Sequence, residues 1–198
     1  APAAEGEFTT VIGRHTKHHN IADMPFSYLI ENNGSSYLMP AFALRSYGTV
    51  RDIAKWQQRD KRRVCRDIIS YNEYNPLLTF KELKAVQELS ELLESCGDAS
   101  ELHYNNTVIK RRMAERGVTV YRQYIEAAIG AMLSCGSGEG TVCGKWVDIA
   151  GQYIERAYLE SLLDNFSTIE ALESALRDFA TDYDTKAYGW ALAALATV

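Results

Sequence analysis

The chain has 198 residues, enough for one domain or for a small domain with an extension. Hydrophobic residues make up 46% and charged residues 24% of it, which is ordinary for a soluble globular protein. No apolar run reaches the roughly 18 residues that a transmembrane helix needs, and the net charge of −5 speaks against general nucleic-acid binding. We therefore expect a globular protein with neither a membrane nor a nucleic acid as its partner.

The ends of the chain and its cysteines indicate how the chain was derived and in which compartment it is located. Residues 1–7 are small and polar, which is typical of a linker or an artificial extension. The chain has no initiator Met and no signal peptide, so we expect a fragment or a processed product. The four cysteines fit neither a CxxC motif nor a disulfide framework, and free thiols predict a reducing, cytoplasmic location. Whether Cys135 and Cys143 meet across the glycine-rich stretch between them stays open.

Residues 8–48 are predicted to form a short β segment. Residues 8–12 are rich in β-branched side chains, and Phe26–Glu31 and Ser36–Phe42 are strand-like runs. Asn32-Asn33-Gly34-Ser35 separates these runs, and Asn and Gly tolerate the positive φ of a tight hairpin turn. The sequence therefore predicts one strand followed by a hairpin.

From residue 49 to residue 198 the hydrophobic period is that of a helix. Apolar stripes predict helices over about 50–69, 79–97, 106–117, 119–134, 145–163 and from 167 onward, and a last helix or a kinked continuation covers 186–196. Thr79-Phe80-Lys81-Glu82 and Ser167-Thr168-Ile169-Glu170 have the pattern of capping boxes at helix starts. Because each helix carries a single stripe, we expect a mainly α protein in which a bundle of about five to seven helices follows the β segment.

The segment Gly13–Asn20 holds three of the four histidines of the chain. Neutral imidazole is a general base or a metal ligand near pH 7, and a nearby carboxylate can orient it. The alternative is a polar surface loop that happens to be rich in histidine, and no HExxH frame favours a metal site. The candidate catalytic residues are His15, His18 and His19. The candidate ligand-binding residues beside them are Arg14, Lys17, Asn20 and Asp23.

Two basic runs are further candidates for an anion site. Arg59, Arg62 and Arg63 fall on one face of the predicted helix, where guanidinium groups bind phosphate in bidentate fashion. The alternative is a solvated helix face with salt bridges, and the same two interpretations apply to Lys110–Arg112. The glycine-rich stretch 136–145 is not a nucleotide-binding P-loop, because Trp146 follows Lys145 where that motif needs Ser or Thr.

A family resemblance rests on residues from His18-His19-Asn20 to Leu29-Ile30-Glu31 and from Leu44-Arg45-Ser46 to Lys61-Arg62. They resemble the later part of long proteins of unknown function from Bacteroides-type bacteria. The amino-terminal part of those proteins is similar to the left-handed β-helix of hexapeptide-repeat acyltransferases and sugar nucleotidyltransferases, and their carboxy-terminal part is helical. The resemblance implies that residues 8–48 are the exit of an upstream β-helix. It also implies that the chain is a helical module, in a trimer if the β-helix assembles as such helices usually do.

Three functions remain open at this point. In the first, a helical module of a transferase-like protein receives a sugar phosphate or nucleotide sugar between the histidine segment and the arginine face. In the second, the chain is a non-catalytic interaction or oligomerisation domain, which the clean amphipathic stripes favour. The third, a metal-dependent hydrolase built on the histidines, lacks a recognisable ligand frame. The sequence names no cofactor and does not decide whether the chain is an enzyme.

Overall fold

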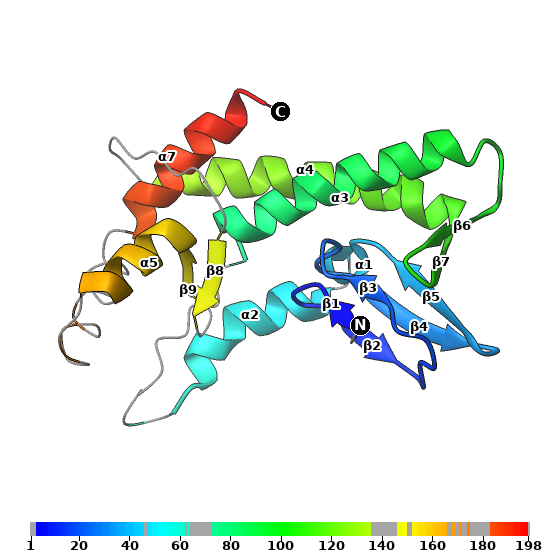
Figure 1. Cartoon of the computed structure of the whole chain (residues 1–198), viewed down its shortest axis with the longest axis horizontal. Coiled ribbons are helices and arrows are strands. Elements are labelled where there is room, and N and C mark those ends of the chain that lie inside the picture. Colours follow the sequence, from blue (N-terminus) through cyan, green and yellow to red (C-terminus); the bar gives the residue numbers. More distant parts are fainter. Residues whose placement is uncertain are drawn as a thin grey trace. The chain divides into compact units, whose positions relative to one another are not determined.

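The computed structural model describes residues 3–45, 47–61, 63, 73–135, 146–149, 152–165, 168, 171, 174 and 183–197. The chain divides into two compact units (Figure 1). The first unit comprises Ala1–Gln57 and Leu78–Glu126, and the second comprises Gln58–Leu77 and Ala127–Val198.

A five-stranded mixed sheet is the centre of the first unit. Its order is β2 (Thr10–Ile12), β4 (Tyr28–Asn32), β5 (Ser35–Met39), β7 (Thr107–Lys110) and β6 (Glu101–Tyr104). The pairs β4–β5 and β6–β7 are antiparallel, whereas β2–β4 and β5–β7 are parallel. Outside this sheet, β1 (Ala4–Glu5) pairs in parallel with β3 (Asn20–Ile21), so residues predicted to be a linker include a strand.

Two hairpin turns of the same type join these strands. The central residues Asn33 and Gly34 have φ values of 50° and 80°, and Asn105 and Asn106 have 45° and 65°. Positive φ at both central positions gives a turn whose twist matches that of the flanking strands. The first hairpin confirms the prediction. The second does not, because a helix was expected to start at residue 106 or 107, where the β-branched run Thr107–Ile109 instead forms β7.

Helices α1 (Phe42–Arg45), α2 (Tyr47–Arg59), α3 (Pro76–Ser95) and α4 (Arg111–Cys135) complete this part of the fold. Helix α3 begins at Pro76, a residue suited to the first helical position because it has no N–H to satisfy there. Thr79 and Glu82, the expected capping box, therefore lie inside the helix, where both are buried. Helix α4 continues through Gly117, where two helices were predicted. Glycine is needed there because a Cβ atom would lie 2.8 Å from Cβ of Pro40.

The core of the first unit is built around Phe26, which packs with Ala43 and Leu78. Phe8 stacks on Phe26 with ring centroids 4.9 Å apart and ring planes 5° from parallel. Both residues have a positive φ, which costs about 1–2 kcal/mol for a residue with a side chain. Burial of an aromatic ring offsets this, since a fully buried Phe contributes about 1.5–3 kcal/mol.

The second unit contains a hairpin that the sequence did not predict. Strands β8 (Trp146–Ile149) and β9 (Gln152–Glu155) pair antiparallel and lead into α5 (Arg156–Asn165). The helix predicted over 145–163 is therefore wrong in its first half. The helix predicted over 186–196 is present as α7 (Tyr183–Leu195), with Ala187 and Ala191 buried at helical spacing.

Several predicted features fall outside the described residues. They are the second half of the helix over 50–69, the glycine-rich stretch and Cys143. The helix predicted from Ser167 is described only at residues 168, 171 and 174, where N of Ala171 donates to Oγ1 of Thr168 at 3.2 Å, as in a helix cap.

The expectation of a mainly α protein is wrong. The described residues form a mixed α/β fold, with the five-stranded sheet, two further two-stranded sheets and several helices. Strands of four residues were misread because so short an apolar run matches a helical stripe as well as a strand. None of the described helices combines the length and the apolarity needed to cross a bilayer.

Candidate functional site

Polar side chains surround a pocket of about 310 Å³ in the first unit, here called the polar pocket. This volume is at the lower end of the range for small-molecule sites. Lys17 approaches from the loop between β2 and β3, Ser35 and Ser36 from the start of β5, and His103–Val108 from the β6–β7 hairpin. The pocket forms at the turn end of the sheet, because β5 and β7 each begin after a turn and run in parallel.

The second turn ties the histidine loop, residues 13–19, and the strand that follows it to this end of the sheet. Nδ2 of Asn106 donates to the backbone oxygen of His18 at 2.7 Å, and Nδ2 of Asn105 donates to that of Asn20 at 3.0 Å. Asn suits both positions because it tolerates positive φ and carries an amide donor. The sequence pattern does not reveal these two residues as site residues, because it predicts the start of a helix at residue 106 or 107.

His15 and Ser36 form a pair beside the pocket. Nδ1 of His15 lies 2.8 Å from Oγ of Ser36, and Nε2 lies 3.2 Å from the backbone oxygen of Ile12. A carbonyl oxygen only accepts hydrogen bonds, so in the neutral ring Nε2 carries the proton and Nδ1 accepts from the serine hydroxyl. A hydroxyl that donates to an oriented imidazole is the minimal arrangement of an activated nucleophile.

The other two candidate histidines have different surroundings. His19 is 4% exposed, with Nε2 3.4 Å from Oε1 of Glu5 on strand β1. That contact is within ion-pair distance but lacks hydrogen-bond geometry, and in the described part of the chain neither ring nitrogen of His19 has a hydrogen-bond partner. The ring of His15 lies edge-on to it at a centroid distance of 5.8 Å. The side chain of His18 is exposed, and only its backbone oxygen is bonded to the hairpin.

Of the four candidate ligand-binding residues beside the histidines, one lines the polar pocket and the other three lie elsewhere. Lys17 lines the polar pocket, whereas the side chain of Arg14 is exposed. Oδ1 of Asn20 accepts from N of Ala22 at 3.3 Å. Asp23 binds Lys84 of α3, with Oδ2 2.6 Å from Nζ, and this hydrogen bond raises the pKa of Lys84.

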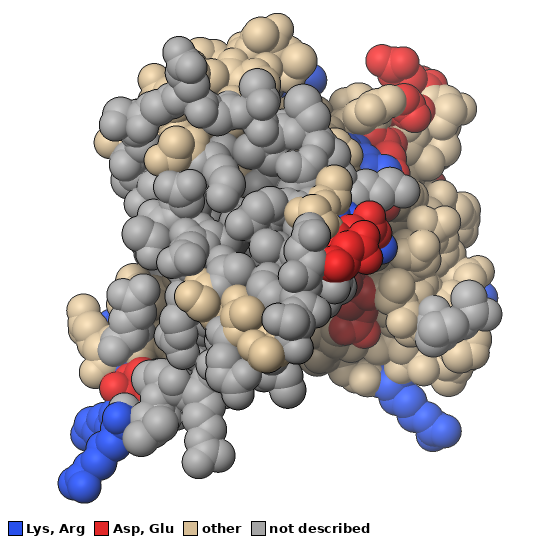
Figure 2. All heavy atoms as spheres, turned by 60° about the vertical axis from the view of Figure 1, so that its left-hand side comes forward, with Lys and Arg blue, Asp and Glu red and all other residues tan. Residues whose placement is uncertain are grey.

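The arginine face belongs to the second unit. Arg59 and Arg63 are exposed there, and Arg62 is not among the described residues. Figure 2 shows Lys and Arg side chains that extend from the surface into solvent. No set of three or more His, Cys, Asp and Glu side chains in the described ranges is grouped to hold a metal ion.

His103, the histidine outside the loop, also lines the polar pocket and was not predicted as a site residue. It lies on β6 between the buried Leu102 and the half-buried Tyr104, and its own side chain is exposed. Residues 101–104 alternate polar and apolar side chains as a strand with one exposed face does, but four residues are too few to distinguish this period from a helical stripe.

Tyr104 lies at the edge of the pocket, where burial and a hydrogen bond change the pKa of its hydroxyl group. Its hydroxyl donates to Oε2 of Glu88 at 2.5 Å, and burial together with this bond raises the pKa of Tyr104 above its ordinary value. The phenol therefore stays protonated near neutral pH and serves as a hydrogen-bond group rather than as a base.

Comparison with known proteins covers part of this region. No curated protein and no solved structure matches the chain. Residues 1–93 match the family described as a domain of unknown function, DUF4954. The matched region includes the histidine loop, Ser35 and Ser36 but ends before the β6–β7 hairpin that completes the pocket. The match gives no indication of a β-helix or of a hexapeptide transferase.

Proposed function

We propose that the first unit binds a small polar anion of the sugar-phosphate type in the polar pocket. The observation that carries the proposal is the composition of the lining, in which Lys17 stands among hydroxyl, amide and imidazole groups. Such groups donate to and accept from sugar hydroxyls, and a lysine ammonium is a point charge suited to a phosphate.

The charge of the lining favours an anion. The whole chain has a net charge of −5, yet the described residues of the lining include no Asp or Glu, so none of them places a carboxylate beside Lys17 in the pocket wall. His103 adds a second cation when it is protonated.

Thermal unfolding of the full chain with three ligands tests this proposal. We expect a glucose phosphate to raise the Tm, and glucose or inorganic phosphate alone to raise it less, because each lacks half of the recognised groups. Lys17→Gln should weaken binding about tenfold, the loss expected for one charge-assisted hydrogen bond. Arg14→Gln is the matched control, since Arg14 is on the same loop but does not line the pocket. Equal losses in the two variants, or no shift with any ligand, would contradict the proposal.

A second candidate function is ester hydrolysis or acyl transfer at Ser36, favoured by its bond to His15. In this reaction Oγ of Ser36 attacks the acyl carbon, and its proton passes to Nδ1 of His15. The alkoxide leaving group takes that proton. Water or a second hydroxyl, giving its proton to Nδ1 of His15, then attacks the acyl carbon, and Oγ of Ser36 leaves and takes that proton back. Nε2 of His15 stays bonded to the oxygen of Ile12 throughout.

A fluorophosphonate probe followed by mass spectrometry distinguishes this second function from simple binding. We expect labelling at Ser36, and we expect His15→Gln to slow it about 10²-fold or more because the hydroxyl loses its base. Ser35→Ala is the matched control, since Ser35 lines the same pocket. Absence of labelling, or labelling that His15→Gln leaves unchanged, excludes the nucleophile. The alternative of a non-catalytic oligomerisation domain stays a prediction, which the mass of the protein in solution tests.

A further inference from the structure

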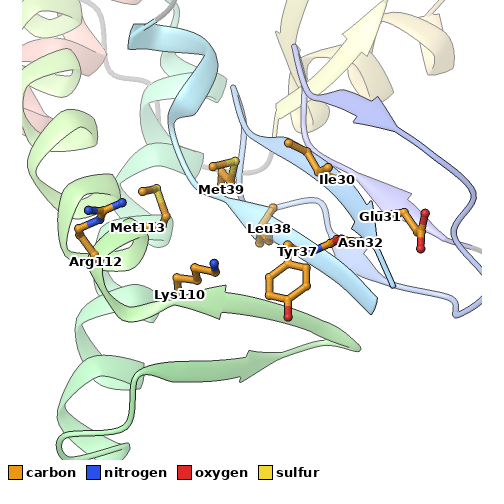
Figure 3. Close-up of a pocket in the computed structure, with 9 residues that line it drawn as sticks. All are labelled: Ile30, Glu31, Asn32, Tyr37, Leu38, Met39, Lys110, Arg112 and Met113. Atoms are coloured by element: carbon orange, nitrogen blue, oxygen red, sulfur yellow. The ribbon is translucent and has the colours of Figure 1, made fainter. Parts of the chain in front are cut away.

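A second cleft of about 370 Å³ in the first unit has a different chemistry from the polar pocket (Figure 3). Strands β4 and β5, the end of β7 and the first turn of α4 form it. Its apolar wall includes Ile30, Met39 and Met113, and its charged rim includes Lys110 and Arg112. We call it the amphipathic cleft.

The register of the sheet explains the apolar wall. Ile30 pairs with Tyr37 and Tyr28 with Met39, so these side chains share one face of the sheet. The alternate residues Leu29 and Leu38 are buried, and Leu38 also borders the cleft. Met39 and Met113 come from a strand and a helix, and their unbranched thioether chains adapt to apolar groups of varied shape.

The cations of the rim are available to a ligand. Lys110 and Arg112 are exposed, and no carboxylate of the described residues lies within ion-pair distance of either. Nζ of Lys110 lies 5.7 Å from the centroid of the Tyr37 ring, a contact that holds the ammonium group over the cleft. The first turn of α4 contains no acidic residue that would neutralise this charge.

The acidic residue in the lining does not oppose an anion. Oε1 of Glu31 accepts from N of Gly34 at 2.7 Å, which commits the carboxylate to the β4–β5 turn. In Figure 3 this side chain lies on the far side of the cleft from Arg112 and points away from the other labelled residues. The charge facing the ligand is therefore that of Lys110 and Arg112.

We infer that the amphipathic cleft binds a small organic anion with an apolar body. The apolar body packs on Met39, Met113 and Ile30, and a phosphate or carboxylate group binds Lys110 and Arg112. This site is separate from the polar pocket and does not depend on the function proposed there, because the polar pocket offers no comparable apolar wall.

Methyl NMR of the full chain tests the inference, since two of the four methionines line the cleft. With labelled methionine methyl groups, naphthyl phosphate should shift the signals of Met39 and Met113. The buried Met24 and Met132, which are 0% and 4% exposed, are internal controls whose signals should stay in place. Inorganic phosphate lacks the apolar body and naphthol lacks the anion, so each should shift the two signals less at equal concentration.

The charged rim is tested by a variant with Lys110→Gln and Arg112→Gln, which keeps the fold because both side chains are exposed. We expect its affinity for naphthyl phosphate to fall about tenfold or more while its response to naphthol is unchanged. Arg122→Gln, an exposed arginine farther along α4, and Lys17→Gln in the polar pocket should both bind as the native chain does. The inference is overturned if Met39 and Met113 do not respond at millimolar ligand, if all four signals shift alike, or if the charge variant binds with native affinity.

Discussion

The polar pocket and the amphipathic cleft are built on the same two strands. Ser35 and Ser36 at the beginning of β5 line the polar pocket, whereas Tyr37 and Met39 farther along β5 line the cleft. The beginning of β7 likewise belongs to the pocket and its last residue, Lys110, to the cleft. Residues at the beginning of the β5–β7 strand pair therefore form one site, and residues farther along the same pair form a second site of different chemistry. The two sites differ in the interactions that stabilise them.

Hydrogen bonds hold one site and packing holds the other. The polar pocket depends on the amide groups of Asn105 and Asn106, which bind the backbone at His18 and Asn20. The cleft depends on the approach of α4 to the end of β5, where Gly117 meets Pro40. A substitution at either of these two places should weaken ligand binding at one site and leave the other unchanged. A change in the shared core should not distinguish the two sites.

The largest difference in ligand binding between the two sites is expected from Gly117→Ala. The added Cβ would lie 2.8 Å from Cβ and 3.4 Å from the backbone oxygen of Pro40, so α4 must shift, at a cost of about 1–3 kcal/mol in the free energy of unfolding. Naphthyl phosphate should bind the cleft more weakly, while a glucose phosphate binds as before. Urea unfolding and the methionine methyl signals measure the two effects.

Gly130→Ala is the control in the same helix, because a Cβ there meets no atom of the described residues within 4 Å. It should be neutral or stabilising by up to about 1 kcal/mol from helix propensity alone. Equal losses at both sites in Gly117→Ala would show that the two sites are not held independently.

The next effect acts on the scaffold common to both sites. Glu82 is 1% exposed, its Oε1 has no hydrogen-bond partner among the described residues, and burial raises its pKa well above the ordinary value. Between the unfolded and the folded pKa, the folded chain holds a proton that the unfolded chain has released. The free energy of unfolding should therefore fall as pH rises through this window, by at most about 1.4 kcal/mol per pH unit.

Glu82→Gln removes the titrating group with little change in shape, so this pH dependence should flatten in urea unfolding measured from acidic to neutral pH. Ligand binding at both sites should keep its own pH dependence in the variant. A slope identical to that of the native chain would mean that Glu82 is not the group responsible.

The smallest effect, and the one confined to the polar pocket, is expected from Asn106→Gly. Glycine adopts the φ of 65° without strain but lacks the amide that binds the backbone of His18. The loss should be about 0.5–1.5 kcal/mol, with faster hydrogen exchange in the histidine loop and weaker binding of a glucose phosphate. Asn106→Ala should cost more, because it adds strain at positive φ. Weaker binding of naphthyl phosphate in Asn106→Gly would contradict the separation of the sites.

Local sequence chemistry accounts for part of this fold. Asn33-Gly34 between two apolar runs specified a tight hairpin, because the turn needs positive φ at both positions. The hairpins over 101–110 and 146–155 were missed, because four-residue strands are too short to establish a period of two against a helical stripe. The local pattern predicts a helix end at Gly117, but the small size of this residue allows a close approach to Pro40, which no local pattern indicates.

Local sequence patterns specify the turn at Asn33-Gly34, the amphipathic helices α3 and α4, the apolar terminal helix α7, and the polar histidine loop from which Lys17 enters the pocket. The tertiary structure sets the parallel pairing of β5 with β7, which brings Ser36 beside the Asn105–Asn106 turn and places Met39 near Met113. It also decided that His15 bonds Ser36 while Asp23 bonds Lys84. The physical reason is that turn and helix preferences act over a few residues, whereas strand pairing and pocket walls depend on which distant segments bury their apolar faces together.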